Sequence, residues 1–175
     1  MEPHCVDAPS PWVVRWAALI ARGPVLDLAC GSGRHARFLS GRSLQVVAVD
    51  RGAQALPADI RFVQFDLESS APWPFRGERF GAIVVTNYLH RPLFPDIAAS
   101  LGEGGVLIYE TFMVGNERYG KPSNPNFLLR PGELLQAFRQ LEVIAFEQAA
   151  VSSPKLAVVQ RLCARSSGSV PEFRG

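Results

Sequence analysis

Two acidic residues and two glycines form the pattern in this chain that most clearly indicates a functional site. Asp27 lies in the apolar run VLDL, Gly31 and Gly33 follow in the segment ACGSG, and Asp50 ends a second apolar run, VVAVD. Glycine lets the backbone take positive φ and come close to a ligand, and the free N–H groups at the start of a following helix favour an anionic group. A strand, a glycine loop, a helix and a strand ending in an acid predict a site for a nucleoside-containing cofactor.

The elements that position these residues follow from the alternation of apolar and amphipathic segments. Ser10 and Pro11 are typical of a helix start. Expected helices cover residues 12–21, 34–40, 92–101 and 131–140, and expected strands cover residues 25–29, 45–49, 60–65, 80–86, 104–110, 141–150 and 156–164. This order, a strand–helix unit repeated five times and then a strand pair, predicts an α/β domain with a mostly parallel sheet and helices on both faces.

Composition indicates one globular domain over residues 1–165, with an N-terminal arm and helix at 1–22 and a disordered polar tail at 166–175. Of the 175 residues, 47% are hydrophobic and 19% are charged. The net charge of +2 comes with 16 Arg and two Lys spread along the chain, so we expect no nucleic-acid partner. No apolar run reaches about 18 residues and no basic leader precedes an apolar stretch, so we expect a cytoplasmic protein without a membrane partner. The near absence of Lys beside abundant Arg and Ala indicates a GC-rich, bacterial genome.

The cysteines give no sign of a disulfide framework or a metal site. Cys5, Cys30 and Cys163 are odd in number and lack CxxC spacing. We therefore expect reduced thiols and no bound metal.

The glycine loop alone is compatible with two cofactors. Gly31 to Ala36 also matches the G-x-G-x-x-[GA] pattern of dinucleotide-binding domains, with Asp50 as the acid that follows. Two features disfavour a dinucleotide cofactor. Asp27 and three further residues separate the apolar run from the glycines, and the chain leaves little room for a second substrate region. An NAD(P)-dependent oxidoreductase is the alternative function, and a non-catalytic cofactor-binding regulatory protein is another.

With Asp66 and Leu67 after the third expected strand and Asn87 after the fourth, the chain resembles the class I S-adenosylmethionine-dependent methyltransferases over about residues 25–164. Within that superfamily it is most similar to the small tellurite-resistance-type and general methyltransferase-domain proteins. The resemblance implies a Rossmann-like, doubly wound, mostly parallel seven-stranded sheet with an antiparallel last strand. It also implies S-adenosyl-L-methionine as cofactor, no metal, and in-line methyl transfer to a small-molecule acceptor.

The resemblance further implies roles for individual residues. Asp27 would accept from the amino group of the cofactor, Asp50 from both ribose hydroxyls and Asp66 from the adenine amino group. The complete set of expected cofactor-binding residues is Asp27, Ala29, Gly31, Gly33, Asp50, Asp66, Leu67 and Asn87. Arg34 and His35, at the helix start, either face solvent or meet the methionine carboxylate.

Three residues are candidates for catalytic contact with the acceptor: Tyr88, His90 and Glu110. The sequence Asn-Tyr-Leu-His departs from the Asn/Asp-Pro-Pro-Tyr pattern of methyltransferases that act on amino groups of bases or Gln, which disfavours those substrates. His90 can serve as a base, because the ordinary pKa of histidine lies near 6.5, or it packs against the following helix.

Two further segments are expected near the acceptor. Glu110 ends the fifth expected strand beneath residues 112–130, and the length of that stretch predicts a lid, or else a plain surface excursion. Trp12 and Trp16 on the first helix either cover the site or pack on the sheet.

Overall fold

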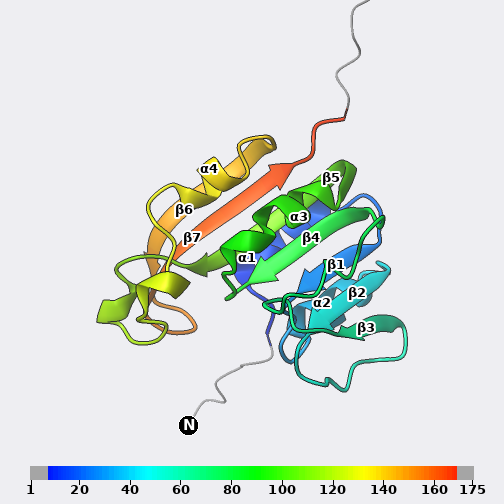
Figure 1. Ribbon diagram of the computed structural model, residues 1–175. Helices are drawn as coiled ribbons and strands as arrows, with labels where there is room; N and C mark the ends of the chain where they lie inside the picture. Colours follow the sequence, from blue (N-terminus) through cyan, green and yellow to red (C-terminus); the bar gives the residue numbers. More distant parts are fainter. Residues whose placement is uncertain (1–7, 169–175) are drawn as a thin grey trace, which may run out of the picture.

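Seven strands form a single sheet in the computed structural model, which describes residues 8–168 (Figure 1). The strands are β1 (Val25–Leu28), β2 (Val46–Asp50), β3 (Ile60–Gln64), β4 (Phe80–Thr86), β5 (Leu101–Phe112), β6 (Glu142–Val151) and β7 (Ala157–Arg165). Their order is β3-β2-β1-β4-β5-β7-β6, in which β1 to β5 are parallel and β7 is antiparallel to both of its neighbours. This arrangement confirms the expected fold, including the antiparallel last strand.

Short helices cover both faces of the sheet. They are α1 (Pro11–Trp16), α2 (Arg34–Ser40), α3 (Phe94–Ala99) and α4 (Glu133–Ala137), with the 3-10 turns η1 (Ala17–Leu19), η2 (Arg91–Leu93), η3 (Asn116–Arg118) and η4 (Pro125–Phe127). α1 and α2 pack on one face, and α3 and α4 pack on the other. The Ser10 side chain accepts from the Trp12 N–H at 3.2 Å and so caps α1.

The strand sequences are apolar at successive positions because the sheet is buried on both faces. Val46 and Ala48 belong to the core beneath α1 and α2, whereas Val47 and Val49 belong to the core beneath α3 and α4. Consecutive strand residues point to opposite faces. A polar side chain in such a strand is therefore buried between the sheet and one of the two helix layers, unless it lies at the end of the strand.

The order falls short of five full strand–helix units at two places. Residues 53–56, between β2 and β3, were expected to form at most one helical turn and contain no helix, and residues 69–79, between β3 and β4, form a loop as expected. Pro57, Pro72 and Pro74 lie in or beside these connections, and proline lacks the N–H that a helix interior needs. The last helix is also shorter than expected, because Gly132 takes φ +69 and α4 begins only at the next residue.

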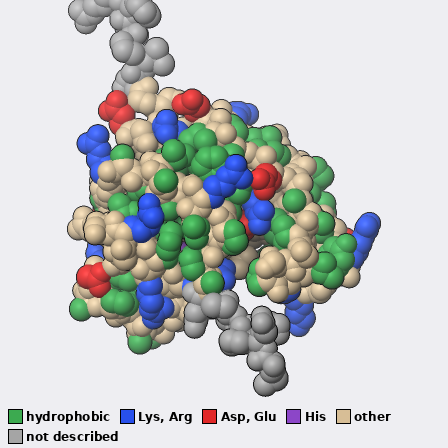
Figure 2. Space-filling view, turned by 180° about the vertical axis from the view of Figure 1, so that it is seen from behind, with side chains coloured by type: hydrophobic (Ala, Val, Ile, Leu, Met, Phe, Trp, Pro, Cys, Tyr) green, Lys and Arg blue, Asp and Glu red, His purple; other side chains and the backbone are tan. Residues whose placement is uncertain are grey.

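Residues 8–168 contain no helix of the length and hydropathy that a membrane crossing requires. Within the same residues, no three His, Cys, Asp or Glu side chains are grouped so that they could hold a metal ion. Figure 2 shows the opposite face of the molecule, where Lys and Arg side chains are dispersed rather than gathered into one patch. Cys5, most of the expected arm and residues 169–175 of the expected tail lie outside the described residues, while the Ser166 N–H donates to the Gly105 carbonyl at 2.8 Å.

Candidate functional site

A cavity of about 320 Å³ lies at the carboxyl ends of the parallel strands. Its lining consists of Ala29, Asp50, Arg51, Phe65, Asp66, Leu67, Glu68, Tyr88 and Phe127. The structure thus brings together five of the residues expected at the site: Ala29 after β1, Asp50 at the end of β2, Asp66 and Leu67 after β3, and Tyr88 after β4. We call this space the first cavity.

The Asp50 carboxylate is held in place by the backbone of two loops. Its Oδ2 atom accepts from the Gly31 N–H at 2.9 Å, and its Oδ1 atom accepts from the Gly52 N–H at 3.0 Å. A carboxylate offers about four lone-pair sites, so each oxygen keeps one for a further donor. Asp50 therefore fastens the glycine loop to the end of β2 and still presents an acceptor pair to the first cavity.

Asp66 and Leu67 present complementary groups at the end of the segment after β3. The Asp66 Oδ1 atom accepts from the Glu68 N–H at 2.9 Å, which fixes the carboxylate in a tight turn. The Leu67 side chain is buried, and within residues 8–168 its backbone N–H has no hydrogen-bond acceptor. One acceptor and one free donor thus lie side by side in the cavity wall.

The glycine loop adopts the left-handed conformations that its residue types predict. Gly31 and Gly33 have φ values of +54 and +78, and Ala29 also has a positive φ. A Cβ atom on Gly31 would meet nothing within 4 Å, whereas one on Gly33 would lie 2.2 Å from Leu56 Cδ2. A Cβ on Gly33 would therefore have to displace the Leu56 side chain, whereas Gly31 leaves an open approach to the backbone.

Asp27 lies beneath the loop rather than in the cavity wall. Its side chain is 1% exposed, and its Oδ2 atom accepts from the Ala36 N–H at 2.9 Å. Burial raises the pKa of Asp27 to about 7, although the Ala36 hydrogen bond and the nearby Arg34 charge act in the opposite direction. The structure shows Asp27 holding the first turn of α2 against β1.

His35 faces neither solvent nor a cavity. Its buried ring lies between α1 and β4, where Nε2 accepts from the Ser10 N–H at 3.0 Å and Nδ1 lies 3.2 Å from Thr86 Oγ1. Because Nε2 is the acceptor, the neutral ring carries its proton on Nδ1 and donates it to Thr86. Burial, with the Arg34 charge, lowers the pKa of His35 to about 4.

Glu110 is not brought to the first cavity. It is 8% exposed, accepts from Ser10 Oγ at 2.7 Å and pairs with the Arg161 guanidinium, which also contacts Glu147 at 3.2 Å. These contacts tie the start of α1 to β5, β6 and β7. The carboxylate expected beneath a lid is instead part of the packing of the first helix.

The other residues expected near the acceptor also have different surroundings. His90 lines neither this cavity nor the second one described below, and its backbone carbonyl accepts from the Leu93 N–H at 3.1 Å at the start of η2. Tyr88 lines the first cavity, beside Asp66 and Glu68. Trp12 is buried against the sheet and its Nε1 donates to the Leu162 carbonyl at 3.4 Å.

A second, wider cavity of about 600 Å³ adjoins the first. Its lining consists of Asn87, Phe112, Lys121, Pro122, Ser123, Asn124, Phe127 and Lys155. Phe127 lines both cavities and forms a shared wall. Asn87, which has a left-handed φ of +54 and was expected at the cofactor, lies in the second cavity rather than the first.

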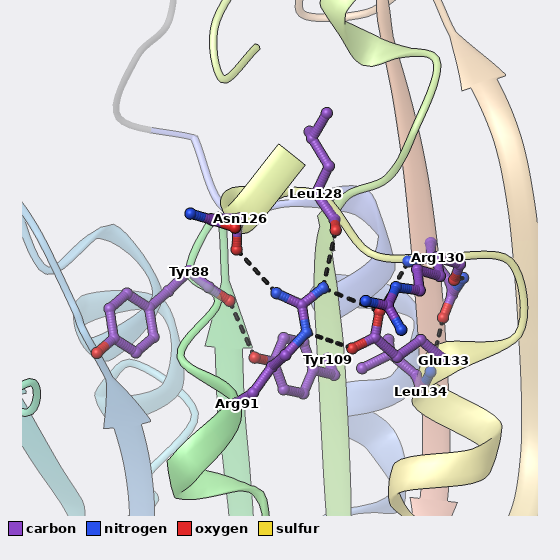
Figure 3. A network of polar contacts seen from close by, with 9 residues as sticks. Tyr88, Arg91, Tyr109, Asn126, Leu128, Arg130, Glu133 and Leu134 are labelled. Atoms are coloured by element: carbon purple, nitrogen blue, oxygen red, sulfur yellow. Dashed lines mark hydrogen bonds and ion pairs between the residues drawn. The ribbon is translucent and has the colours of Figure 1, made fainter. Parts of the chain in front are cut away.

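Arg91 anchors the segment 112–130, as Figure 3 shows. Its guanidinium donates to the carbonyls of Asn126 and Leu128 at 2.8 and 2.9 Å and to both carboxylate oxygens of Glu133. Burial opposes ionisation of Glu133, but the hydrogen bonds from Arg91 and a backbone N–H outweigh it and lower the pKa of this carboxyl. The segment also contains η3 and η4, so it is an ordered wall with a fixed attachment.

Sequence reasoning missed Arg91, Glu133, Phe127 and Lys155. The ion pair spans 42 positions and has no local motif. Phe127 follows an Asn-Pro-Asn turn that gives no chemical signal. The rarity of lysine was visible in the composition and offered the one available clue to Lys155.

Comparison with known proteins shows a family match over part of the chain. Residues 25–105 match the family described as methyltransferase domain. No curated protein sequence matches the chain.

Solved structures with the same fold include methyltransferases of low sequence identity. TehB from Haemophilus influenzae is 18% identical, with a TM-score of 0.73, and the match covers 91% of this chain but only 63% of TehB. The 1,6-didemethyltoxoflavin-N1-methyltransferase of Burkholderia thailandensis, with bound S-adenosylhomocysteine, is 17% identical, has a TM-score of 0.66, and is matched over 90% of this chain and 76% of its own. The glycopeptide N-methyltransferase MtfA, also with S-adenosylhomocysteine, is 20% identical, with a TM-score of 0.59 and 88% of each chain covered.

The topology argues against the dinucleotide alternative. A dinucleotide-binding domain has the strand order 3-2-1-4-5-6, whereas here the antiparallel β7 lies between β5 and β6. Residues 25–105 therefore match a methyltransferase domain, within a sheet that has the fold of the solved methyltransferases.

Proposed function

We propose that the first cavity binds the adenosyl part of S-adenosyl-L-methionine, that the second cavity binds a small-molecule acceptor, and that the protein transfers the methyl group between them. The observation that carries this proposal is the shared wall: Phe127 lines both cavities, so ligands in the two would be neighbours. The volumes, about 320 and 600 Å³, lie in the range of small-molecule sites.

The residues of the first cavity fit the nucleoside part of the cofactor. Each Asp50 oxygen keeps a lone pair for a ribose hydroxyl after binding its backbone N–H. Asp66 has a second oxygen for the adenine amino group, and the Leu67 N–H suits a ring nitrogen. The open side of Gly31 leaves its backbone accessible to the methionine part.

The bound cofactor supplies the electrophilic methyl carbon. The chain contributes by orienting the acceptor and excluding water, through the ordered segment that Arg91 anchors. Among the described residues that line the second cavity, none is a carboxylate or an imidazole. Transfer there is therefore suited to an acceptor atom whose lone pair is already available, without a base from the protein.

Isothermal titration with S-adenosylhomocysteine tests the cofactor assignment. Asp50→Asn should weaken binding about 10- to 100-fold, because it removes one of the two hydrogen bonds to a charged acceptor, which contributes about 1.5–3 kcal/mol. Glu142→Gln, on the exposed start of β6, is the matched control and should bind like the wild type. Failure of the wild type to bind S-adenosylhomocysteine would refute the proposal.

Methyl transfer itself is tested with radiolabelled cofactor and a panel of small acceptors that includes thiols, amines and phenols. We expect label in at least one of them and a loss of transfer in Asp50→Asn. Tight cofactor binding with no labelled product across the panel would instead favour a non-catalytic cofactor-binding protein.

A further inference from the structure

The two lysines of the entire chain line the same cavity. Lys121 and Lys155 are 34 positions apart, and the other 16 basic residues, histidine aside, are arginines. Lys121 lies in the segment 112–130 and Lys155 in the turn between β6 and β7, yet both contribute to the wall of the second cavity. The fold thus places both ammonium groups beside the position proposed for the acceptor.

The charge of these two lysines is available to a ligand. Neither forms an ion pair with any other residue of the described range 8–168. No acidic residue lines the second cavity, whereas three line the first: Asp50, Asp66 and Glu68. The two cavities therefore differ in the sign of their charge, and a ligand with an anionic group would favour the second.

Aromatic surface lies beside the two ammonium groups. Phe112 and Phe127 line the second cavity, and Lys155 Nζ lies 5.8 Å from the centroid of the Phe112 ring. Phe127 is 48% exposed and Leu156, next to Lys155, is 59% exposed. Large apolar side chains left in solvent around a cavity indicate a surface that gains from burial by a ligand.

We infer that the methyl acceptor is an apolar, ring-containing small molecule that carries an anionic group. Lys121 and Lys155 bind the anion, while Phe112 and Phe127 contact the ring. The inference rests on the proposed function, since it names the class of molecule that occupies the second cavity. An ammonium is a compact point charge on a flexible stem, which suits an anion presented from a ring better than a fixed bidentate contact would.

The test uses two fluorescent probes that differ in one charge. 8-Anilinonaphthalene-1-sulfonate carries a sulfonate, and N-phenyl-1-naphthylamine has the same ring system without it. Each is titrated into the protein in saturating S-adenosylhomocysteine, so that the first cavity is filled. The variants are Lys121→Met with Lys155→Met, Phe112→Ala, and a charge-matched control, Arg22→Met with Arg139→Met, which changes two exposed arginines outside both cavities.

We expect the double lysine variant to bind the sulfonate about tenfold more weakly, as the loss of two partly exposed charge contacts predicts. Its affinity for the uncharged probe should stay within twofold of wild type. Phe112→Ala should weaken both probes, and the double arginine control should weaken neither.

Equal loss of the sulfonate in the lysine variant and the arginine control would overturn the inference, as would wild-type binding of both probes with the same affinity. These outcomes differ from a failure of the proposed function. If S-adenosylhomocysteine does not bind the wild type, the cofactor assignment fails. If it binds and the lysines do not discriminate between the probes, only the assigned acceptor class fails.

Discussion

The Arg91 guanidinium and the Glu133 carboxylate form a two-point ion pair, with Nε–Oε1 and Nη2–Oε2 distances of 2.5 and 3.0 Å (Figure 3). The pair joins η2, just after β4, to the first turn of α4. Through the Asn126 and Leu128 carbonyls, the same guanidinium holds the residues on either side of Phe127. One side chain thus fixes the wall that the two cavities share.

Replacing Arg91 should loosen that wall. Arg91→Met removes the ion pair and leaves two carbonyls without their donor, so we expect a loss of about 1–3 kcal/mol in the free energy of unfolding. Hydrogen exchange followed by mass spectrometry should show faster exchange across residues 124–130, with little change in β1 and β2. Arg139→Met, on an exposed position, is the control. Unchanged exchange in 124–130 would show that the segment holds its place without Arg91.

Substitution of the two loop glycines, Gly31 and Gly33, by alanine should have different effects on the free energy of unfolding. Gly31→Ala places Cβ in open space at φ +54, so its cost is the left-handed conformation alone, about 1–2 kcal/mol. Gly33→Ala should cost more, because its Cβ would lie 2.2 Å from Leu56 Cδ2. Gly31→Ala should also weaken binding of S-adenosylhomocysteine, measured by titration calorimetry. Gly104→Ala, with φ +69 and open surroundings, matches its conformational cost and should leave that affinity unchanged.

His35 should make the fold less stable in mild acid. Burial lowers its pKa from 6.5 to about 4, so between these pH values the unfolded chain binds a proton that the folded chain does not. The free energy of unfolding should therefore fall by about 3 kcal/mol from this residue as pH decreases through that window. His35→Gln does not titrate, so urea denaturation at pH 4.5, 5.5 and 7 should show its stability relative to wild type improving as pH falls. A constant difference would contradict the prediction.

Asp27 should have the opposite effect from His35 on how stability depends on pH. Burial raises its pKa from 3.8 to about 7, so over this window the folded chain holds a proton that the unfolded chain has released. Its contribution to stability is present below pH 4 and is lost as pH rises towards 7. The stability of Asp27→Asn relative to wild type should thus rise with pH, in the same urea series. If it falls instead, Asp27 is ionised throughout the range.

Tyr88→Phe should show whether the Tyr88 hydroxyl contacts the cofactor or only takes part in packing. The Tyr88 hydroxyl is buried and has no hydrogen-bond partner among the described residues. Burial and the nearby Glu68 carboxylate raise the pKa of this phenol, so it stays a neutral donor. Removing it should change the free energy of unfolding by less than about 1 kcal/mol while weakening S-adenosylhomocysteine several-fold. Equal affinity in both proteins would place the hydroxyl outside the cofactor site.

The residues that line the first cavity were largely predictable because they depend on local pattern. Asp50 and Asp66 follow apolar runs, and the carboxyl ends of neighbouring parallel strands meet at one edge of a sheet. Gly33 likewise follows from the need for a tight turn before a helix. These positions required no knowledge of distant contacts, and the structure brings Asp50 and Asp66 to one cavity.

The second cavity was not predictable, because it depends on contacts between distant segments. Glu110 was expected to end its strand, but β5 runs on to Phe112, and the Glu110 side chain points to the face covered by α1, where Arg161 lies 51 positions away. Sequence alternation shows that neighbouring residues face opposite layers without showing which layer holds the ligand. Lys155 reaches the second cavity only because the turn between β6 and β7 comes to lie beside the segment 112–130.

The position of β7 between β5 and β6 sets an order for folding. During synthesis β1 to β4 can pair while the chain is still growing, whereas β6 lies at the sheet edge and has no neighbour until residues 157–165 have been made. Lys155 comes just before that last strand, and Val158 N–H closes the segment 112–130 by donating to Asn116 at 3.1 Å. The strand ends that line the first cavity, Phe127 aside, are therefore made before the second cavity, whose wall includes Lys155 and closes only when the final strand inserts.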